Sequence, residues 1–471
     1  ISDCDTIPSV SRDYHYTATI DEAAAASLEA GGDISCGPEY ARLTRAFASG
    51  LISQSSLERA VRRVLTSRML VGDLDPHSHD PYARIGLEVV DSREHRELAT
   101  QMSRESVVLL KRGRGFPLRD RSKRMTIALL GPSADDPSVQ AHTYHGSPNS
   151  WLTLEGSLRQ LLTRYPDVTL LRAAGCDRHS HARDGFDKAM ETASTADAIV
   201  FVGGLDAEDE EEDTDRTHLR LPGVQGELVL RLARLALARG VPLAVVIYSG
   251  GPIAEPSLVS HPGVDSIFWS SYSGQTCQGM AEALLGLNNP SGCLPFTIPH
   301  NESQLGAITD YSMSAGNGRT YRYLNTAAAP PLFPFGYGLS FSKWSYADLI
   351  TTPTILVLHP PGTPSLAAVS TRVTNQGALF GMLTIQLYAR FDRSPDHPVP
   401  GLPLRQLLNF TKLSLKPGAT TPVQLEVDVG SIISIRHQTL PTTLHLWVGN
   451  ADESAAEATC KLKIELASTA V

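Results

Sequence analysis

The sequence lacks a long hydrophobic run, a net positive charge and any closely spaced pair of cysteines. Its 471 residues contain no stretch of about eighteen apolar residues, so no membrane-spanning helix is predicted. The net charge of −9 argues against a protein that binds nucleic acid. The six cysteines show no CxxC spacing, which argues against a structural zinc site.

What is present is the composition of a globular protein, with 42% hydrophobic and 19% charged residues. The length predicts roughly two to four domains. Two sequons, headed by Asn301 and Asn409, would permit N-glycosylation if the protein is secreted.

The chain is organised around an acidic run between Gly203 and Gly223. It contains Asp206, Glu208, Asp209, Glu210, Glu211, Glu212 and Asp213. Crowded like charges disfavour ionisation, so at least one of these acids should keep its proton to a higher pH, as a general acid must. A solvated acidic loop is the plainer alternative. We favour a site because the run follows an apolar strand at 198–202, and ligands of α/β proteins gather beyond the carboxyl ends of strands.

The beginning of the chain is typical of the end of a β/α barrel. We expect strands at 1–5 and 31–37, alternating with helices at 21–30, 40–49 and 55–70. Residues 1–75 would then be the C-terminal part of a barrel, and 76–90 a linker. Asp3 and Asp5 would share a face of the first strand, and its spacing does not separate their roles. Cys4 and Cys36 follow the acidic positions, so both a disulfide and two buried thiols fit.

From residue 91 to about 310, helices and apolar strands alternate, which predicts an α/β sandwich with a mainly parallel sheet. Its first helix is expected at 94–110. Residues 311–339 form a Gly- and Pro-rich aromatic connector. Short alternating runs over 340–471 predict a small β-sandwich. The expected fold class is therefore α/β, with a barrel end, a parallel-sheet domain and a β-sandwich.

Several stretches, in this order along nearly the whole chain, resemble glycoside hydrolase family 3 and within it the β-xylosidase and α-arabinofuranosidase branch. They are Ser2–Asp5, Gly31–Gly37, Glu105–Lys111, Asp215–Thr217, Leu221–Gln225, Gly318–Tyr323 and Phe335–Leu339. The resemblance implies that the C-terminal sandwich is fibronectin-type-III-like. It also implies that most of the N-terminal barrel of such enzymes is absent from this sequence.

The resemblance assigns the catalytic pair. Asp3 matches the family's nucleophile and is expected to have a low pKa. Glu212 matches the acid/base, with a raised pKa expected from its crowded neighbours. Glu210 is the second choice, because the crowded glutamates allow the register to shift.

Other residues are expected to bind the sugar or position the loop. Cys4, directly after the nucleophile, resembles the pentose-specific branch, and Tyr144 resembles an aromatic residue that approaches the sugar, with a core tyrosine as the alternative. Asp215 and Arg216 fix the match of the loop to the family's pattern and are expected to position the loop. Arg216 would hold it through Asp213 or Asp206, or else form an ordinary surface ion pair.

These features together predict a secreted, retaining exo-glycosidase without metal or other cofactor. It would release xylose from the non-reducing end of β-1,4-xylooligosaccharides or from aryl xylosides, with no nucleic-acid or membrane partner. The alternatives are α-L-arabinofuranosidase or β-glucosidase specificity, a non-catalytic carbohydrate-binding or assembly fragment, and a calcium site in the acidic run, whose spacing is unlike a calcium loop. Because an incomplete barrel leaves strand edges unpaired, we expect the chain to need an N-terminal barrel segment for activity.

Overall fold

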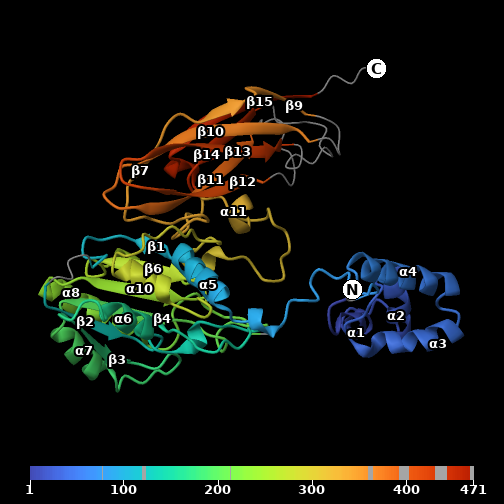
Figure 1. Ribbon diagram of the computed structural model, residues 1–471, viewed down its shortest axis with the longest axis horizontal. Coiled ribbons are helices and arrows are strands. Elements are labelled where there is room, and N and C mark those ends of the chain that lie inside the picture. The colour runs from blue at the N-terminus through green and yellow to red at the C-terminus, as the bar shows by residue number, and fades with distance from the viewer. Residues whose placement is uncertain are drawn as a thin grey trace. The chain divides into compact units, whose positions relative to one another are not determined.

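The computed structural model describes residues 1–76, 78–118, 123–212, 214–358, 364–391, 403–429 and 443–466. They belong to two compact units, Ile1–Val90 and Asp91–Val471, which can be followed by colour in Figure 1. No helix in these ranges combines the length and apolarity needed to cross a bilayer.

The first unit is helical. It consists of α1 (Thr6–Arg12), α2 (Ile20–Glu29), η1 (Pro38–Arg42), α3 (Leu43–Ala48), α4 (Gln54–Leu70) and η2 (Leu87–Val89). Helix α2 begins at a complete capping box formed by Thr19 and Glu22, which satisfies backbone amides at its first turn. The core of this unit is small and rich in alanine: Ile7, Ala23, Ala24, Ala25, Leu28, Ala46, Ile52 and Ala60.

The strands expected at 1–5 and 31–37 are not formed. Among the described residues, one backbone hydrogen bond joins these segments, from the amide of Ser2 to the carbonyl of Ile34. Two segments without further neighbours do not make a stable ladder, since strands depend on partners beside them. The segments are instead joined covalently by a disulfide between Cys4 and Cys36, which decides between the two alternatives for these cysteines.

The second unit contains a six-stranded sheet with the order β1-β6-β5-β4-β2-β3. Strands β2 to β6 are parallel, whereas β1 runs antiparallel to β6 at one edge. The strands are β1 (Val108–Lys111), β2 (Met125–Leu130), β3 (Val168–Ala173), β4 (Ala198–Gly204), β5 (Leu243–Tyr248) and β6 (Ser266–Ser270).

Helices cover both faces of this sheet, as Figure 1 shows. One face packs against α7 (Phe186–Ser194), α8 (Gln225–Arg239) and α9 (Pro256–Ser260), and the other against α6 (Leu154–Leu162) and α10 (Gln278–Leu284). Strand β4 is buried along its whole length, as a central parallel strand should be.

The helix expected at 94–110 is shorter than predicted. Helix α5 spans Arg93–Ser106, and the apolar residues after it form β1. Val108 and Leu110 belong to the core on one face of the sheet, and Val107 and Leu109 to the core on the other. Burial on both faces requires the period of two, which overrides the helical pattern before it.

A β-sandwich follows the sheet domain. One sheet contains β7 (Trp344–Tyr346), β8 (Ile350–Thr352), β10 (Leu366–Asn375) and β13 (Thr420–Asp428). The other contains β9 (Ile355–Leu358), β11 (Gly381–Phe391), β12 (Gln406–Leu415), β14 (Thr443–Val448) and β15 (Ala458–Leu466). Short helices complete the described elements: η3 (Pro137–Val139), η4 (Glu302–Gln304), α11 (Thr320–Tyr323) and η5 (Glu453–Ala455). The predicted α/β class, with a mainly parallel sheet followed by a β-sandwich, is confirmed.

The strand order reverses beside β2. Strand β3 lies on one side of β2, and the chain then crosses back to place β4 on the other. At such a switch point the loops that leave the two strands diverge and open a crevice at the carboxyl end of the sheet. The loop after β2 and the acidic loop after β4 are therefore the two that flank this crevice.

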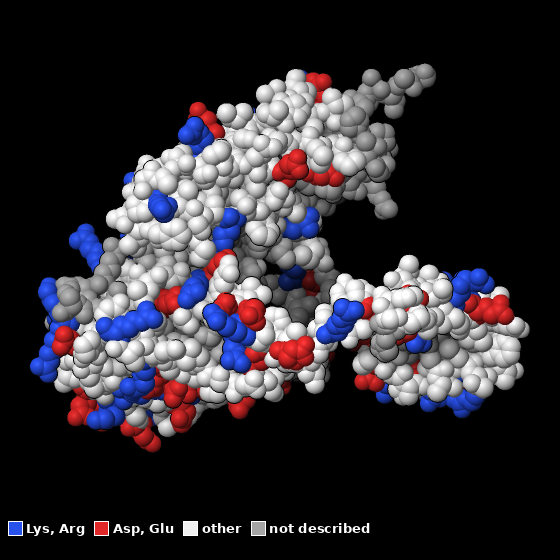
Figure 2. Space-filling view, in the orientation of Figure 1, with Lys and Arg blue, Asp and Glu red and all other residues white. Residues whose placement is uncertain are grey.

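Charged side chains of both signs lie intermixed on the face of the molecule that Figure 2 draws, and they are sparse over the sandwich. An extended positive area, which a polyanion would need, is not seen on that face. That the chain binds no nucleic acid stays a prediction.

Helix α5 is tied to α10 by a bidentate ion pair. Arg104 donates to both oxygens of Glu282 at 2.6 and 2.7 Å, and the Glu282 side chain is only 9% exposed. Glu282→Gln should lower the free energy of unfolding by about 1–2 kcal/mol, because the partly exposed guanidinium of Arg104 loses a counter-charge that is itself largely buried. The measurement is urea denaturation. The matched control is Glu97→Gln, which removes the exposed pair with Arg93 and should leave the free energy of unfolding nearly unchanged. Equal losses for the two variants would contradict the role given to Glu282.

Candidate active site

The acidic loop, residues 205–216, is fastened at its start by a buried arginine. Arg178 is 7% exposed, and its guanidinium donates to Asp206, to Asp136 at 2.6 Å and to the hydroxyl of Ser138 at 3.2 Å. Asp136 lies in the loop after β2, whereas Asp206 lies just after β4. One cation therefore holds together the two loops that flank the switch point.

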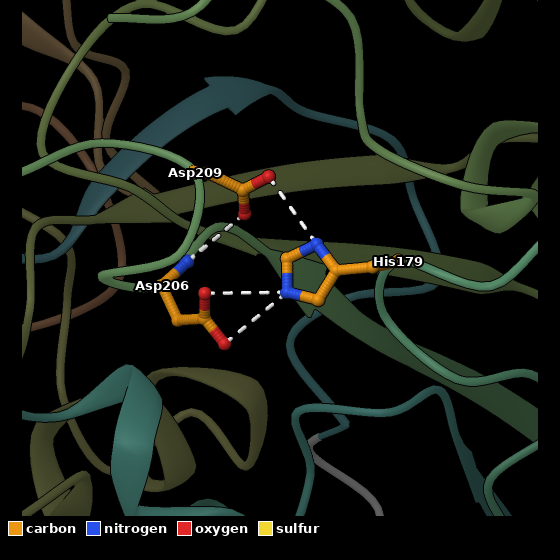
Figure 3. Close-up of side chains that lie close together, drawn as sticks. All are labelled: His179, Asp206 and Asp209. Atoms are coloured by element: carbon orange, nitrogen blue, oxygen red, sulfur yellow. Dashed lines mark hydrogen bonds and ion pairs between the residues drawn. The ribbon is translucent and has the colours of Figure 1, made fainter. Parts of the chain in front are cut away.

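His179 holds a second acid of the same loop, as Figure 3 shows. Its Nε2 lies 3.3 Å from Oδ1 of Asp206, and its Nδ1 lies 3.4 Å from Oδ1 of Asp209. Burial raises the pKa of Asp209, with the nearby charge of Asp206 adding to the effect. An acid of the run that keeps its proton to higher pH was predicted from crowding, but at Asp209 the main cause is loss of solvent.

The atoms of His179, Asp206 and Asp209 lie within 4.8 Å of one another, as possible metal ligands would. Arg178 already neutralises Asp206, however, and a divalent cation there would lie beside a fixed positive charge. The donor set thus fits an ion-pair network better than a metal site. We assign these side chains to the anchoring of the loop.

Glu210 is engaged through both carboxylate oxygens. Its Oε2 lies 3.1 Å from Nε of Arg216. Its Oε1 accepts hydrogen bonds from the amides of Gly250 and Gly251, at 2.6 and 3.1 Å, and from the hydroxyl of Tyr272 at 2.7 Å. Burial, together with this hydrogen bond, raises the pKa of Tyr272, so the hydroxyl remains a donor. The side chain of Glu210 is 17% exposed and ties the loop to the segment after β5.

Arg216 positions the loop through a partner other than the expected ones. It pairs with Glu210 and donates to the carbonyl of Pro252 at 3.0 Å, whereas Asp206 is held by Arg178. The other expected partner, Asp213, lies outside the described residues. Because the Arg216 side chain is 13% exposed, its ion pair is not an ordinary surface pair. Asp215 is exposed, and its side chain makes no hydrogen bond or ion pair with a residue that the structure describes.

Glu212 occupies the tip of a tight turn in the loop. The backbones of Glu211 and Thr214 pair across this turn, with the amide of Thr214 donating to the carbonyl of Glu211 at 3.0 Å. The side chain of Glu212 is exposed and accepts a hydrogen bond from the hydroxyl of Tyr144. Of the two glutamates considered for acid/base chemistry, Glu212 is the one with access to solvent.

The segment that carries Tyr144 belongs to the loop after β2. Tyr144 is 89% exposed, so it is not a core tyrosine, and its φ of 63° is uncommon for a residue with a side chain. Such backbone conformations cluster at functional sites, although they also occur elsewhere. Two residues earlier, His142 contacts the carbonyl of Glu210 and stacks on Tyr272 with ring centroids 4.8 Å apart. The loop after β2 therefore contacts the acidic loop at two places.

Asp3 lies in the first unit and is exposed. One of its carboxylate oxygens accepts a hydrogen bond from the amide of Cys4 at 2.8 Å, and the sulfur of Cys4 is bonded to Cys36. Asp5 adopts a φ of 58° as the N-cap residue of α1, and its carbonyl accepts from the amide of Ser9. The two aspartates that the strand period placed together thus differ, since Asp5 begins a helix and Asp3 lies beside the disulfide.

Local sequence patterns do not single out Arg178, His142 and Tyr272. Each touches the acidic loop from a different strand end, and none belongs to a local motif. The available signal was topological: in a parallel sheet, polar residues after neighbouring strands lie at the same edge. That rule selects Arg178 and His179 after β3 and Tyr272 after β6.

Asp91 fastens the Tyr144 segment to the rest of the domain. Its carboxylate accepts hydrogen bonds from Asn149 at 2.6 Å, Gln275 at 2.9 Å and Arg96 at 3.0 Å. The bond from Gln275, and then that from Arg96, hold the pKa of Asp91 below its usual range. A lowered pKa in the folded state means that ionised Asp91 stabilises the fold above about pH 4. This contribution is lost as the pH falls through the lowered pKa.

We therefore expect Asp91→Asn to lower the thermal unfolding midpoint at pH 7, and the difference from the unaltered chain to shrink on acidification below about pH 4. Thermal unfolding followed by circular dichroism between neutral and acid pH measures this. Asp215→Asn, at an exposed position, is the matched control and should leave the curve unchanged. A difference at position 91 that does not vary with pH would show that ionisation is not the cause.

Comparisons with known proteins bear on the family and fold of this chain. Residues 107–341 match the model of the glycosyl hydrolase family 3 C-terminal domain. The chain is 34% identical to Beta-D-xylosidase 1 of Arabidopsis thaliana, over 91% of this chain and 57% of that protein. It thus spans little more than half the length of this curated relative.

Two solved structures are similar over 98% of the chain. One is a GH3 exo-beta-xylosidase (XlnD) in complex with a xylobiose aziridine activity-based probe, with a TM-score of 0.86, 26% identity and 60% of that chain covered. The other is a β-glucosidase of Erythrobacter marinus, with a TM-score of 0.82, 25% identity and 63% of that chain covered. The match to the family model, the identity to the curated relative and the likeness to these structures together show that the chain belongs to glycoside hydrolase family 3.

Proposed function

We propose that this chain provides the catalytic pair of a retaining exo-β-xylosidase, with Asp3 as nucleophile and Glu212 as acid/base. The observation that supports it most is the contrast between the two glutamates of the acidic loop. Glu210 has donors on both oxygens, whereas Glu212 is exposed at the switch point and is contacted by Tyr144. An acid/base group must gain and lose a proton in each cycle, which suits a carboxylate open to solvent.

The proposed reaction is a double displacement. Asp3 attacks the anomeric carbon while Glu212 gives a proton to the oxygen of the leaving group. The bond from that carbon to the leaving oxygen breaks as the glycosyl-enzyme bond to Asp3 forms. Glu212 then removes a proton from water, the water oxygen attacks the same carbon, and the bond to Asp3 breaks. The two carboxylates must approach to about 5–5.5 Å for this chemistry. The hydrogen bond from Tyr144 orients the Glu212 carboxylate, so this tyrosine acts as a positioning residue and lies close to the sugar.

Xylose is the sugar that the names of two similar proteins favour as the substrate sugar of this chain. Beta-D-xylosidase 1 of Arabidopsis and the exo-beta-xylosidase structure are both similar to this chain, and Cys4 follows the nucleophile as in the pentose-specific branch. With its sulfur bonded to Cys36, Cys4 presents a compact side chain beside Asp3. The likeness to a β-glucosidase keeps glucoside specificity as the alternative, and arabinofuranoside hydrolysis remains a second one.

The outer face of the first unit supports the need for further barrel segments. Val61, Leu65 and Met69 recur every fourth residue on α4 and are 54%, 42% and 64% exposed. A continuous apolar row of this kind is ordinarily covered by protein. We propose that it packs against an N-terminal barrel segment in the active protein, which agrees with the share of the relatives' length that this chain spans.

We also propose that the protein is secreted, on the basis of its disulfide and its sequons. The disulfide between Cys4 and Cys36 is of the kind that persists in oxidising compartments. Two sequons are present as well.

The need for the barrel is tested by labelling and turnover. The chain alone should neither hydrolyse an aryl xyloside nor react with a 2-fluoro-xyloside inactivator, because the nucleophile lacks the remainder of its sugar-binding barrel. The same chain extended by a family 3 barrel segment should do both, and peptide mass spectrometry should find the label on Asp3. Turnover by the chain alone would remove the requirement for the barrel. A label on another residue would remove the assignment of Asp3.

The two glutamates are separated by leaving-group dependence in the barrel-extended protein. Glu212→Gln should reduce kcat/KM on xylobiose by about 10²–10⁴-fold, with a much smaller loss of kcat/KM on an aryl xyloside whose leaving group needs no proton, because kcat/KM covers only the steps up to the glycosyl-enzyme. Glu210→Gln should reduce kcat/KM on both substrates to a similar extent, since it loosens the loop without removing the acid. Reversed results would make Glu210 the acid/base, and unchanged activity in both variants would favour a non-catalytic role for this chain.

A further inference from the structure

The fold uses the side chains of the two sequon asparagines in different ways. Asn301 heads the sequon with Ser303, in the second unit between β6 and the connector, and Asn409 heads the one with Thr411 on β12. Both match the acceptor pattern, so the sequence does not distinguish them. N-glycosylation joins a bulky glycan to the amide nitrogen of asparagine, so the surroundings of that nitrogen decide whether the folded chain has room for it.

Asn301 is exposed and uses only its carbonyl oxygen. Its Oδ1 accepts hydrogen bonds from the amide of Ser303 at 3.0 Å and from the Ser303 hydroxyl at 2.6 Å. It thereby caps the short helix η4. Its Nδ2 donates to no residue in the described parts of the chain. A sugar on this nitrogen therefore displaces no hydrogen bond, and the capping oxygen stays in place.

The residues around Asn301 hold the sequon in this orientation. The carboxylate of Glu302, the middle residue of the sequon, turns inward and accepts from the amide of Leu219 at 2.7 Å. Gln304 donates to the carbonyl of Pro330 at 3.1 Å and accepts from the amide of His300 at 2.6 Å. Because Glu302 and Gln304 are held by these hydrogen bonds, the side chain of Asn301 is left pointing toward solvent.

An open hollow adjoins Asn301 on the outer surface. It has a volume of about 380 Å³ and is bordered by Arg220, Pro256 and His300 among others. The first sugar of a glycan thus has free space on this side as well.

The side chain of Asn409, unlike that of Asn301, uses both its nitrogen and its oxygen in hydrogen bonds. It is half-buried, its Nδ2 donates to the carbonyl of Glu426 at 2.6 Å, and its Oδ1 accepts from the amide of Phe410 at 2.7 Å. Strand β12 is the edge of one sheet of the sandwich, and β13, which contains Glu426, is the edge of the other. The amide of Asn409 therefore ties two sheet edges together, and a sugar on its nitrogen would lie against the neighbouring strand.

We propose that Asn301 is the N-glycan acceptor of this chain and that Asn409 carries none in the folded protein. The inference rests on the secretion proposed above. In the reaction, a bond forms between Nδ2 of Asn301 and the anomeric carbon of a lipid-diphosphate-linked oligosaccharide. The bond from that carbon to the diphosphate breaks, and the amide nitrogen loses one proton.

The test expresses the whole chain with a secretory signal peptide in a eukaryotic host, so that entry into the pathway does not depend on the native location. The purified folded chain is treated with peptide N-glycosidase in heavy-oxygen water, which marks each formerly glycosylated asparagine for mass spectrometry. The mark should appear at Asn301 and be absent at Asn409. A mark at Asn409, or an unmarked Asn301, would overturn the proposal, whereas the xylosidase function is judged separately by turnover.

Two substitutions serve as matched controls. Ser303→Ala should abolish the glycan, seen as a mobility shift on gels that enzymatic deglycosylation no longer changes. Thr411→Ala should leave mobility unaltered, because the second sequon is unused. Loss of the glycan in the Thr411 variant but not in the Ser303 variant would assign it to Asn409 and contradict the proposal.

Discussion

The candidate site depends on one buried guanidinium, that of Arg178. It lies between Asp136 and Asp206, whose loops leave β2 and β4 on either side of the switch point. A buried charge must keep its partners, since losing one leaves an uncompensated charge in a poorly solvated place. The bases of both loops are therefore held together, and this allows Tyr144 and Glu212, further along the same loops, to meet.

Repulsion within the acidic run is reduced because some of its side chains point inward to positively charged partners and the others point outward to solvent. Asp206, Asp209 and Glu210 turn inward, where Arg178, His179 and Arg216 face them. Glu208, Glu211 and Glu212 remain exposed to solvent, which screens them. The acids that are crowded in the sequence thus form a loop whose inward side chains are held by ion pairs and whose turn is exposed to solvent. The outward group at the tip of the turn is Glu212, so the proposed proton donor is open to solvent.

The sequence was sufficient for the architecture wherever a segment is buried on both faces or alternates regularly. Strand β4 and the acidic loop after it are examples. It was insufficient where contacts with distant segments decide the structure. Residues 1–5 have too few neighbouring segments to become a strand. Residues 107–111 leave the helical pattern because both their faces are buried. The different roles of Glu210 and Glu212 could not be predicted either. Apart from Arg216, the groups that engage Glu210 lie 40 to 62 residues further along the chain, from Gly250 to Tyr272.

The two halves of the proposed catalytic pair differ in how completely their surroundings are formed. Glu212 belongs to a loop whose base is held by ion pairs on a sheet covered on both faces, so its position follows from a finished fold. Asp3, by contrast, has one hydrogen bond among the described residues of its own unit, from the adjacent amide of Cys4. A nucleophilic carboxylate is kept ionised and oriented by several donors. In the proposed protein, a barrel segment would supply donors for the other oxygen of Asp3 and would cover the exposed apolar row on α4 of the same unit. The proposed barrel segment would thus account for the unformed strand at residues 1–5, the exposed row on α4 and the single hydrogen bond of Asp3.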